Sequence, residues 1–76
     1  MPEEMPEKAR QLFLIFRDAV QREREAQITY KRAAELCEDT ELIELLLGFY
    51  KDEVRHEEAL VEQYNLLRDR YSAQAE

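Results

Sequence analysis

The sequence predicts an all-α protein, an antiparallel two-helix hairpin that pairs with a second copy to form a four-helix bundle. The 76 residues are 38% charged and include one Gly and two Pro, a composition typical of long helices. Apolar residues recur at alternating spacings of three and four, as on one face of a helix. Two helices of this length cannot enclose a self-sufficient core, and chains this short usually need disulfides, a metal or a partner. The single cysteine excludes an internal disulfide and fits a reducing compartment.

The first helix is predicted over residues 6–38, after a short flexible arm at 1–5. Pro6 suits the first helical position, and the charge of Glu7 favours the helix start. Position 23 falls within the apolar stripe of this helix but holds Glu23. The other members of the stripe are Ala9, Leu12, Phe16, Ala19, Ala26, Tyr30, Ala33 and Cys37.

A second helix is predicted over 40–71, with a frayed tail at 72–76. The first positions that continue this stripe beyond Cys37 at intervals of seven residues are all charged, so the apolar stripe ends with the first helix. Asp39 or Thr40 can cap the new helix. The new apolar stripe contains Leu42, Leu46, Phe49, Leu60 and Leu67.

Two positions of the second stripe are also ionisable, Glu53 and His56. With the turn midway between positions 39 and 40, Glu23 lies 16.5 positions before it, Glu53 13.5 after it and His56 16.5 after it. In an antiparallel pair these three residues therefore meet at one level, ~20–25 Å from the turn. Glu53 and His56, three residues apart, share one helix face.

A layer of ionisable groups in an apolar interface indicates a bound metal. Uncompensated burial of a carboxylate costs several kcal/mol. Di-metal four-helix bundles use one Glu from each of two helices and one Glu-x-x-His from each of the other two. Each hairpin supplies half of that set, and two copies supply four carboxylates to balance two divalent ions. The alternative interpretation is a polar layer that only fixes helix register.

The same residues make the chain resemble the ferritin-like superfamily, specifically its rubrerythrin and encapsulated-ferritin branches. The matching patterns are Glu23-x-x-Ala26-x-x-x-Tyr30, Glu53-x-x-His56, and the stretch from Asp39-Thr40-Glu41-Leu42 to Asp52-Glu53. The resemblance covers about 13–67. Rubrerythrins carry two such hairpins and a rubredoxin domain, whereas this chain has one hairpin and no Cys-x-x-Cys. Encapsulated ferritins have a lone hairpin, and their iron site forms only between subunits.

The resemblance implies two iron ions per dimer, with Glu23 and His56 as terminal ligands and Glu53 as a bridging ligand. It implies Tyr30 as a partner of the ligands, although an ordinary core aromatic is an equal alternative. Glu25 matches one acidic position through which encapsulated ferritins admit metal, but Arg22 occupies another. Separately, Glu57 is the first candidate for a spare ligand. Mixed carboxylate and imidazole ligands suit iron or manganese and tolerate zinc.

The function predicted on this basis is ferroxidase chemistry, the oxidation of Fe(II) to Fe(III) for iron storage or detoxification. The alternatives are a rubrerythrin-like peroxide reductase and a non-enzymatic acidic helical interaction module. The net charge of −7 argues against nucleic acid as a partner, because nucleic-acid binding favours a basic face. No apolar run approaches the ~20 residues of a membrane span. We expect a cytoplasmic protein, and the resemblance adds a location inside an encapsulin-type shell.

A further stripe on the second helix predicts assembly beyond the dimer. Leu47, Val54 and Val61 repeat every seven residues, and Ile43 and Tyr50 flank them. We expect this stripe to lie exposed, on a face turned away from the first helix. An exposed apolar stripe of this length indicates a second interface and therefore a higher homo-oligomer.

Overall fold

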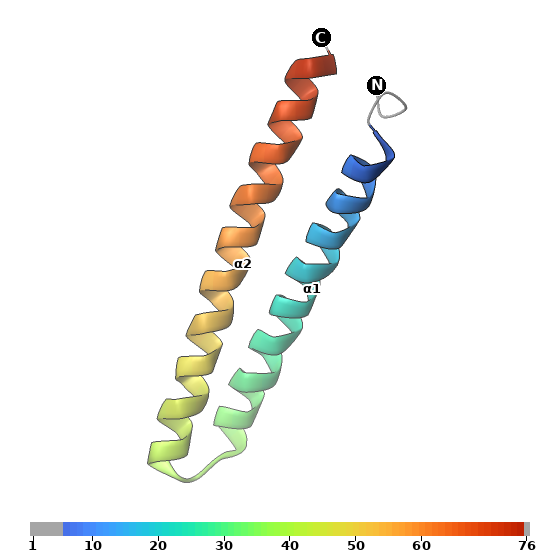
Figure 1. Cartoon of the computed structure of the whole chain (residues 1–76). Helices are drawn as coiled ribbons and strands as arrows, with labels where there is room; N and C mark the ends of the chain where they lie inside the picture. The colour runs from blue at the N-terminus through green and yellow to red at the C-terminus, as the bar shows by residue number, and fades with distance from the viewer. Residues whose placement is uncertain (1–5, 76) are drawn as a thin grey trace.

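The protein is an antiparallel helical hairpin, in which α1 (Glu7–Leu36) and α2 (Thr40–Ala75) lie side by side and α2 extends beyond the start of α1 (Figure 1). The computed structural model describes residues 6–75. The hairpin is a rod of 55 × 15 × 13 Å, as expected for helices of 30 and 36 residues with a rise of about 1.5 Å per residue. The all-α hairpin predicted from the sequence is confirmed.

The turn between the two helices consists of residues 37–39. α1 ends at Leu36, two residues before the predicted end, because Cys37 adopts an extended conformation with φ −90° and ψ 143°. Asp39 then caps α2: its Oδ1 accepts hydrogen bonds from the backbone N–H groups of Glu41 at 2.9 Å and Leu42 at 3.2 Å. The cap satisfies amides that the first turn of a helix leaves without partners. Of the two predicted caps, Asp39 and Thr40, the structure shows Asp39 in this role.

The outer ends of the helices differ slightly from the prediction. α1 begins at Glu7, and the carbonyl of Pro6 accepts the first helical hydrogen bonds, from Ala9 and Arg10. α2 continues to Ala75, through residues predicted to fray. No Gly or Pro interrupts this segment, and the Tyr71 ring packs edge-on against Phe13 with ring centroids 6.1 Å apart. The predicted arm at 1–5 lies outside the described residues.

The interface between the helices contains two rows of side chains from each helix, each row repeating every seven residues. In α1 these half-buried or buried side chains are Ala9, Phe13, Phe16, Val20, Glu23, Gln27, Tyr30 and Ala34. In α2 they are Ile43, Leu46, Tyr50, Glu53, Glu57, Leu60, Tyr64, Leu67 and Tyr71. This alternation of three and four is the packing pattern of antiparallel coiled helices. Aromatic contacts support it, including Phe13 with Tyr64 at 5.3 Å and Tyr30 with Phe49 at 5.4 Å.

One flank of the hairpin is apolar and open; we call it the apolar side. It is formed by the rows Leu12, Ala19, Ala26 and Ala33 of α1 and Leu42, Phe49, His56 and Gln63 of α2. Leu12, Leu42 and Phe49 are each at least 40% exposed. At the open end of the hairpin, a hollow of about 240 Å³ on this side is lined by Leu12, Phe16, Gln63, Leu66, Leu67 and Arg70.

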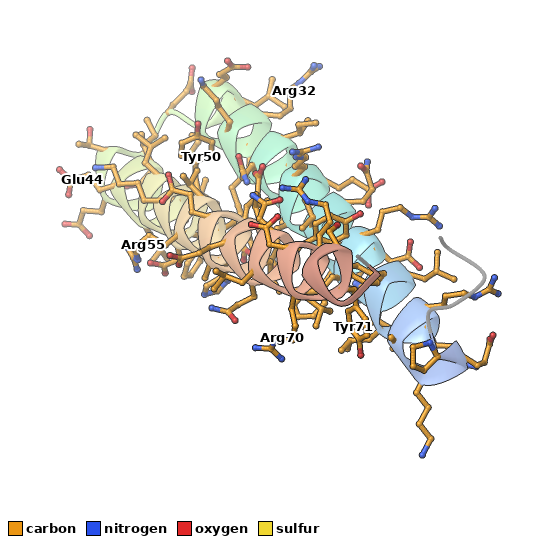
Figure 2. The ribbon with its side chains drawn as sticks, turned by 90° about the horizontal axis from the view of Figure 1, so that it is seen from above. Arg32, Glu44, Tyr50, Arg55, Arg70 and Tyr71 are labelled. Atoms are coloured by element: carbon orange, nitrogen blue, oxygen red, sulfur yellow. The ribbon has the colours of Figure 1, made fainter. Side chains whose placement is uncertain are left out.

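The opposite flank is polar on α1 and is closed by contacts between the helices. Arg24 reaches Glu57, and Lys31 lies over the ring of Tyr50, 5.5 Å from its centroid. Figure 2 shows other charged side chains, such as Arg32 and Arg55, projecting away from both helices.

The second stripe that the sequence predicted to be exposed is partly covered here. Ile43 and Tyr50 belong to the helix interface, and Val54 and Val61 beside them are half-buried, whereas Leu47 is exposed. The predicted exposure is wrong for Ile43 and Tyr50 because of how α2 is rotated about its own axis. This rotation turns the row of Ile43 and Tyr50 toward α1. Part of the predicted stripe is therefore not free for a second interface, and assembly beyond the dimer stays a prediction.

The hairpin alone does not bury a core. Among the described residues only Ala9 and Ala34 are buried, at 5% and 9% exposure. The chain exposes 6045 Å², compared with about 4,900 Å² for a compact monomer of this mass. The two helices therefore leave apolar surface that a single copy cannot cover.

Candidate metal centre

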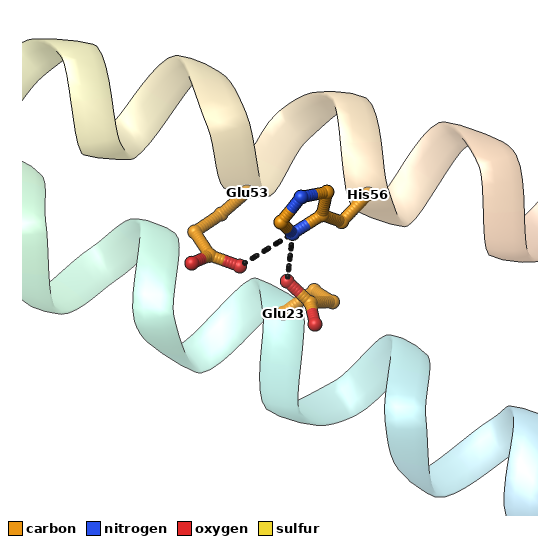
Figure 3. Close-up of side chains that lie close together, drawn as sticks. All are labelled: Glu23, Glu53 and His56. Carbon is orange, nitrogen blue, oxygen red and sulfur yellow. Dashed lines mark hydrogen bonds and ion pairs between the residues drawn. The ribbon is translucent and has the colours of Figure 1, made fainter.

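Glu23 of α1 and Glu53 and His56 of α2 converge between the two helices (Figure 3). The Nδ1 atom of His56 lies 3.3 Å from Oε1 of Glu23 and 3.3 Å from Oε1 of Glu53. One potential ligand atom from each of the three residues falls within 4.8 Å of the other two. The structure therefore brings together the three residues that the sequence predicted at one level.

The convergence follows from the helices themselves. Glu53 and His56 lie one turn apart on α2, so their side chains point in nearly the same direction. The short turn at 37–39 sets the antiparallel register that places Glu23, 33 residues before His56, opposite them. The site rests on two regular helices rather than on loops, which fixes the backbone positions of all three side chains.

The three side chains differ in exposure. The side chains of Glu53 and Glu23 are 19% and 23% exposed, whereas that of His56 is 59% exposed. His56 belongs to the apolar side of the hairpin, between Phe49 and Gln63 in its row. The group is thus closed by α1 and α2 on one flank and open on the apolar side.

The donor set has the chemistry of a divalent-cation site. Two carboxylates and one imidazole are ligands that Fe(II), Mn(II) and Zn(II) accept. Two carboxylates this close to each other repel when both are ionised, and a cation between them relieves that repulsion. Three side chains leave coordination positions free, so one hairpin provides an incomplete ligand shell. The residues present therefore fit a metal ion shared with further ligands.

The other residues singled out from the sequence do not join this group. Glu25 is exposed on the outer surface of α1, where its carbonyl accepts a hydrogen bond from Oγ1 of Thr29 at 3.0 Å. Tyr30 packs its ring against Phe49, at a tilt of 50°, which fits the alternative of an ordinary core aromatic. Its partnership with the ligands stays a prediction.

Glu57 is held on the opposite flank of the interface by two side chains of α1. Its Oε2 accepts a hydrogen bond from Nε of Arg24 at 2.8 Å, and its Oε1 accepts one from Nε2 of Gln27 at 2.6 Å. Both oxygens are therefore engaged away from the metal group. The sequence reasoning missed Arg24 and Gln27. With the same turn position, Arg24 lies 15.5 positions before the turn and Glu57 17.5 after it, an offset of about 3 Å that the long arginine side chain spans.

These bonds make the stability of the metal-free protein depend on the protonation of Glu57. Hydrogen bonds from Arg24, and then from Gln27, favour the carboxylate and hold the pKa of Glu57 below its usual value. A lowered folded-state pKa gives stability that is present above the unfolded-state pKa of about 4.3 and lost as pH falls through the folded value. We expect Glu57→Gln to destabilise the protein by about 1 kcal/mol or less at pH 7 and to have a smaller effect below pH ~4.

Urea unfolding at pH 7 and at a pH below ~4, both in the presence of a chelator, checks this expectation. Glu58→Gln is the matched control, because Glu58 is the exposed neighbour of Glu57. A deficit in Glu57→Gln that stays constant or grows toward acid pH would contradict the expectation.

The chain was compared with known proteins. No protein-family model matches it. Searches of curated proteins and of solved structures return no significant match. Within the described residues, neither helix offers a stretch both long and apolar enough to cross a bilayer.

Proposed function

We propose that two copies of this chain pair through their apolar sides and form a di-metal centre that oxidises Fe(II) to Fe(III). The observation that carries this proposal is the convergence of Glu23, Glu53 and His56 from two helices within 4.8 Å, on the open apolar side. The activity serves iron storage or detoxification, as the ferritin-like resemblance implies. Iron is then the substrate as well as the bound ion, and manganese or zinc can occupy the same ligands.

Pairing through the apolar side is supported by the surface that a single copy leaves open. Small residues at Ala19, Ala26 and Ala33 would allow the helices of a partner to approach closely. Leu42 and Phe49, 44% and 40% exposed, would supply apolar area from α2. Burial of such area is the main driving force of stable association. The same pairing would cover the exposed ring of His56 and bring two ligand groups together.

The charges of the paired groups favour two divalent cations. Each copy contributes two carboxylates, so a pair contributes four negative charges within a layer that pairing removes from water. Two divalent ions balance them, which avoids the large cost of buried like charges. The imidazole of His56 is a ligand only in its neutral form, so binding of the metal requires a free ring nitrogen.

Within this proposal, the protein residues bind, position and shield the metal ions. Glu23, Glu53 and His56 bind Fe(II), and the helices hold them before the metal arrives. The free coordination positions admit an oxidant that accepts one electron from each Fe(II). Carboxylates stabilise Fe(III) because its charge is higher, which favours the oxidised product. The chain therefore needs no organic cofactor for this reaction.

The decisive experiment loads the metal-free protein with Fe(II) under anaerobic conditions and mixes it with oxygen or hydrogen peroxide in a stopped-flow instrument. We expect about two Fe(II) ions to bind per dimer and the near-ultraviolet absorbance of Fe(III) to grow faster than without protein. Oxidation by peroxide but not by oxygen would assign the peroxide reductase function instead. Absence of protein-dependent oxidation with both oxidants would reject the enzymatic proposal.

A second candidate, the non-enzymatic interaction module, is favoured by two observations. Nδ1 of His56 already lies within hydrogen-bond distance of both carboxylates without any metal, and no buried side-chain N or O atom in the described residues lacks a partner. Such a satisfied polar layer can specify helix pairing by itself. It predicts a dimer of unchanged stability when divalent metal is removed by a chelator, whereas the metal centre predicts a lower melting temperature.

A further inference from the structure

A second polar cluster lies one residue beyond the metal group on each helix. Arg24 follows Glu23, and Glu57 follows His56. Arg24 donates to one carboxylate oxygen of Glu57 at 2.8 Å, and Gln27 donates to the other at 2.6 Å. We call these three residues the clamp.

The clamp differs from the other ion pairs of arginine in the described part of the chain, because it joins the two helices. The pairs of Arg10 with Glu7, Arg17 with Asp18, Arg55 with Asp52 and Arg68 with Asp69 each lie within one helix. A pair within a helix adds little to how the helices are placed relative to each other. The carboxylate of the clamp is also less exposed than those of the other pairs, since the side chain of Glu57 is only 22% exposed.

The two hydrogen bonds of Glu57 restrict both sliding and rotation of α2 against α1. One residue of slip moves a side chain by about 1.5 Å along the axis and 100° around it. Arg24 and Gln27 lie one turn apart on α1, so hydrogen bonds from both to a single carboxylate depend on the register and the rotation of α2. That register and rotation also place His56 3.3 Å from Glu23.

We propose that Arg24, Gln27 and Glu57 are positioning residues, which hold the helices in the arrangement that brings Glu23, Glu53 and His56 together. The expected effect on metal binding rests on the proposed metal centre. The effect on the placement of the helices rests on the contacts of the clamp. Outer partners that orient metal ligands typically change affinity by about 10–100-fold when removed. The clamp has the same kind of effect, but it acts on the ligands through the placement of the helices.

The test uses the binding of Zn(II), which is redox-inert, to the full chain in competition with a chromophoric chelator. Arg24→Gln removes a positive charge one residue from a ligand, so electrostatics alone predicts tighter binding of the cation. Positioning predicts the opposite, a loss of affinity of about tenfold. Unchanged or tighter binding by Arg24→Gln would overturn the inference.

Asp52→Asn is the matched control for the removal of a carboxylate in Glu57→Gln. Asp52 precedes Glu53 as Glu57 follows His56, and its partner Arg55 lies on the same helix. Both variants remove one negative charge beside the ligands. We expect Glu57→Gln to bind Zn(II) at least threefold more weakly than Asp52→Asn. Equal losses in the two variants would assign the effect to charge and contradict a positioning role.

A readout without metal separates this inference from the proposed function. NOEs between the ring protons of His56 and the side-chain protons of Glu23 report the convergence directly in labelled, chelator-treated protein. We expect strong NOEs in the wild type and in Asp52→Asn, and weak NOEs in Arg24→Gln at unchanged helix content. A wild type that shows the NOEs but binds no Zn(II) or Fe(II) would reject the metal centre alone. NOEs of full intensity in Arg24→Gln would reject the clamp, whatever the metal result.

Discussion

Glu23→Ala is expected to abolish the binding of about two metal ions per dimer, together with the stabilisation that metal provides. Glu23 is the only one of the three converging residues that α1 contributes, so its loss leaves the ligands of α2 without their partner. At a metal concentration 100 times the dissociation constant, binding stabilises a folded protein by about 2.7 kcal/mol. The variant should lose this increment and keep the helix content of the wild type.

Metal analysis of the purified protein and melting curves with and without Fe(II) or Zn(II) measure this effect. Glu35→Ala is the matched control, since it removes an exposed carboxylate of the same helix that lies away from the metal group. We expect the control to bind metal with wild-type stoichiometry. Retention of both metal ions by Glu23→Ala would refute the proposed centre, and loss in both variants would indicate nonspecific attraction by the acidic surface.

Leu42→Glu is expected to dissociate the dimer and thereby to abolish metal binding, although Leu42 lies far from the metal group. Leu42 lies on the apolar side, 44% exposed, and 14 residues before His56, or about 21 Å along the helix. An acidic residue in the first turn of α2 is favourable for the helix itself. The charge would instead be buried at the interface between copies, twice per dimer. We expect dimerisation to weaken about a hundredfold or more.

Analytical ultracentrifugation and metal titration on the same sample check this prediction. Ile28→Glu makes the same kind of change at a residue of α1 that is 70% exposed and lies outside the apolar side. The control should remain a dimer with bound metal. A Leu42→Glu monomer that still binds metal with wild-type affinity would show that one hairpin suffices, and an unaffected dimer would place the interface elsewhere.

Some features of the fold and site were predictable because they depend on residues close together in sequence. A cap at Asp39 or Thr40 follows from short polar side chains before a helix, and the break after Cys37 follows from the charged continuation of its stripe. The level shared by Glu23 and His56 required only a turn position and the constant rise of a helix. The contacts of Nδ1 of His56 with both carboxylates, at 3.3 Å, confirm that arithmetic.

The sequence by itself determined two helices, their antiparallel register and the depth of the three ionisable residues, because helical rise and periodicity are local properties. Only the tertiary structure decided how each helix is rotated about its own axis. That rotation places Tyr50 and Glu57 at the interface and leaves His56 59% exposed at its edge. An apolar stripe with a repeat of seven fits more than one such rotation, and the choice depends on contacts between residues far apart in sequence, such as those of Arg24 and Gln27 with Glu57.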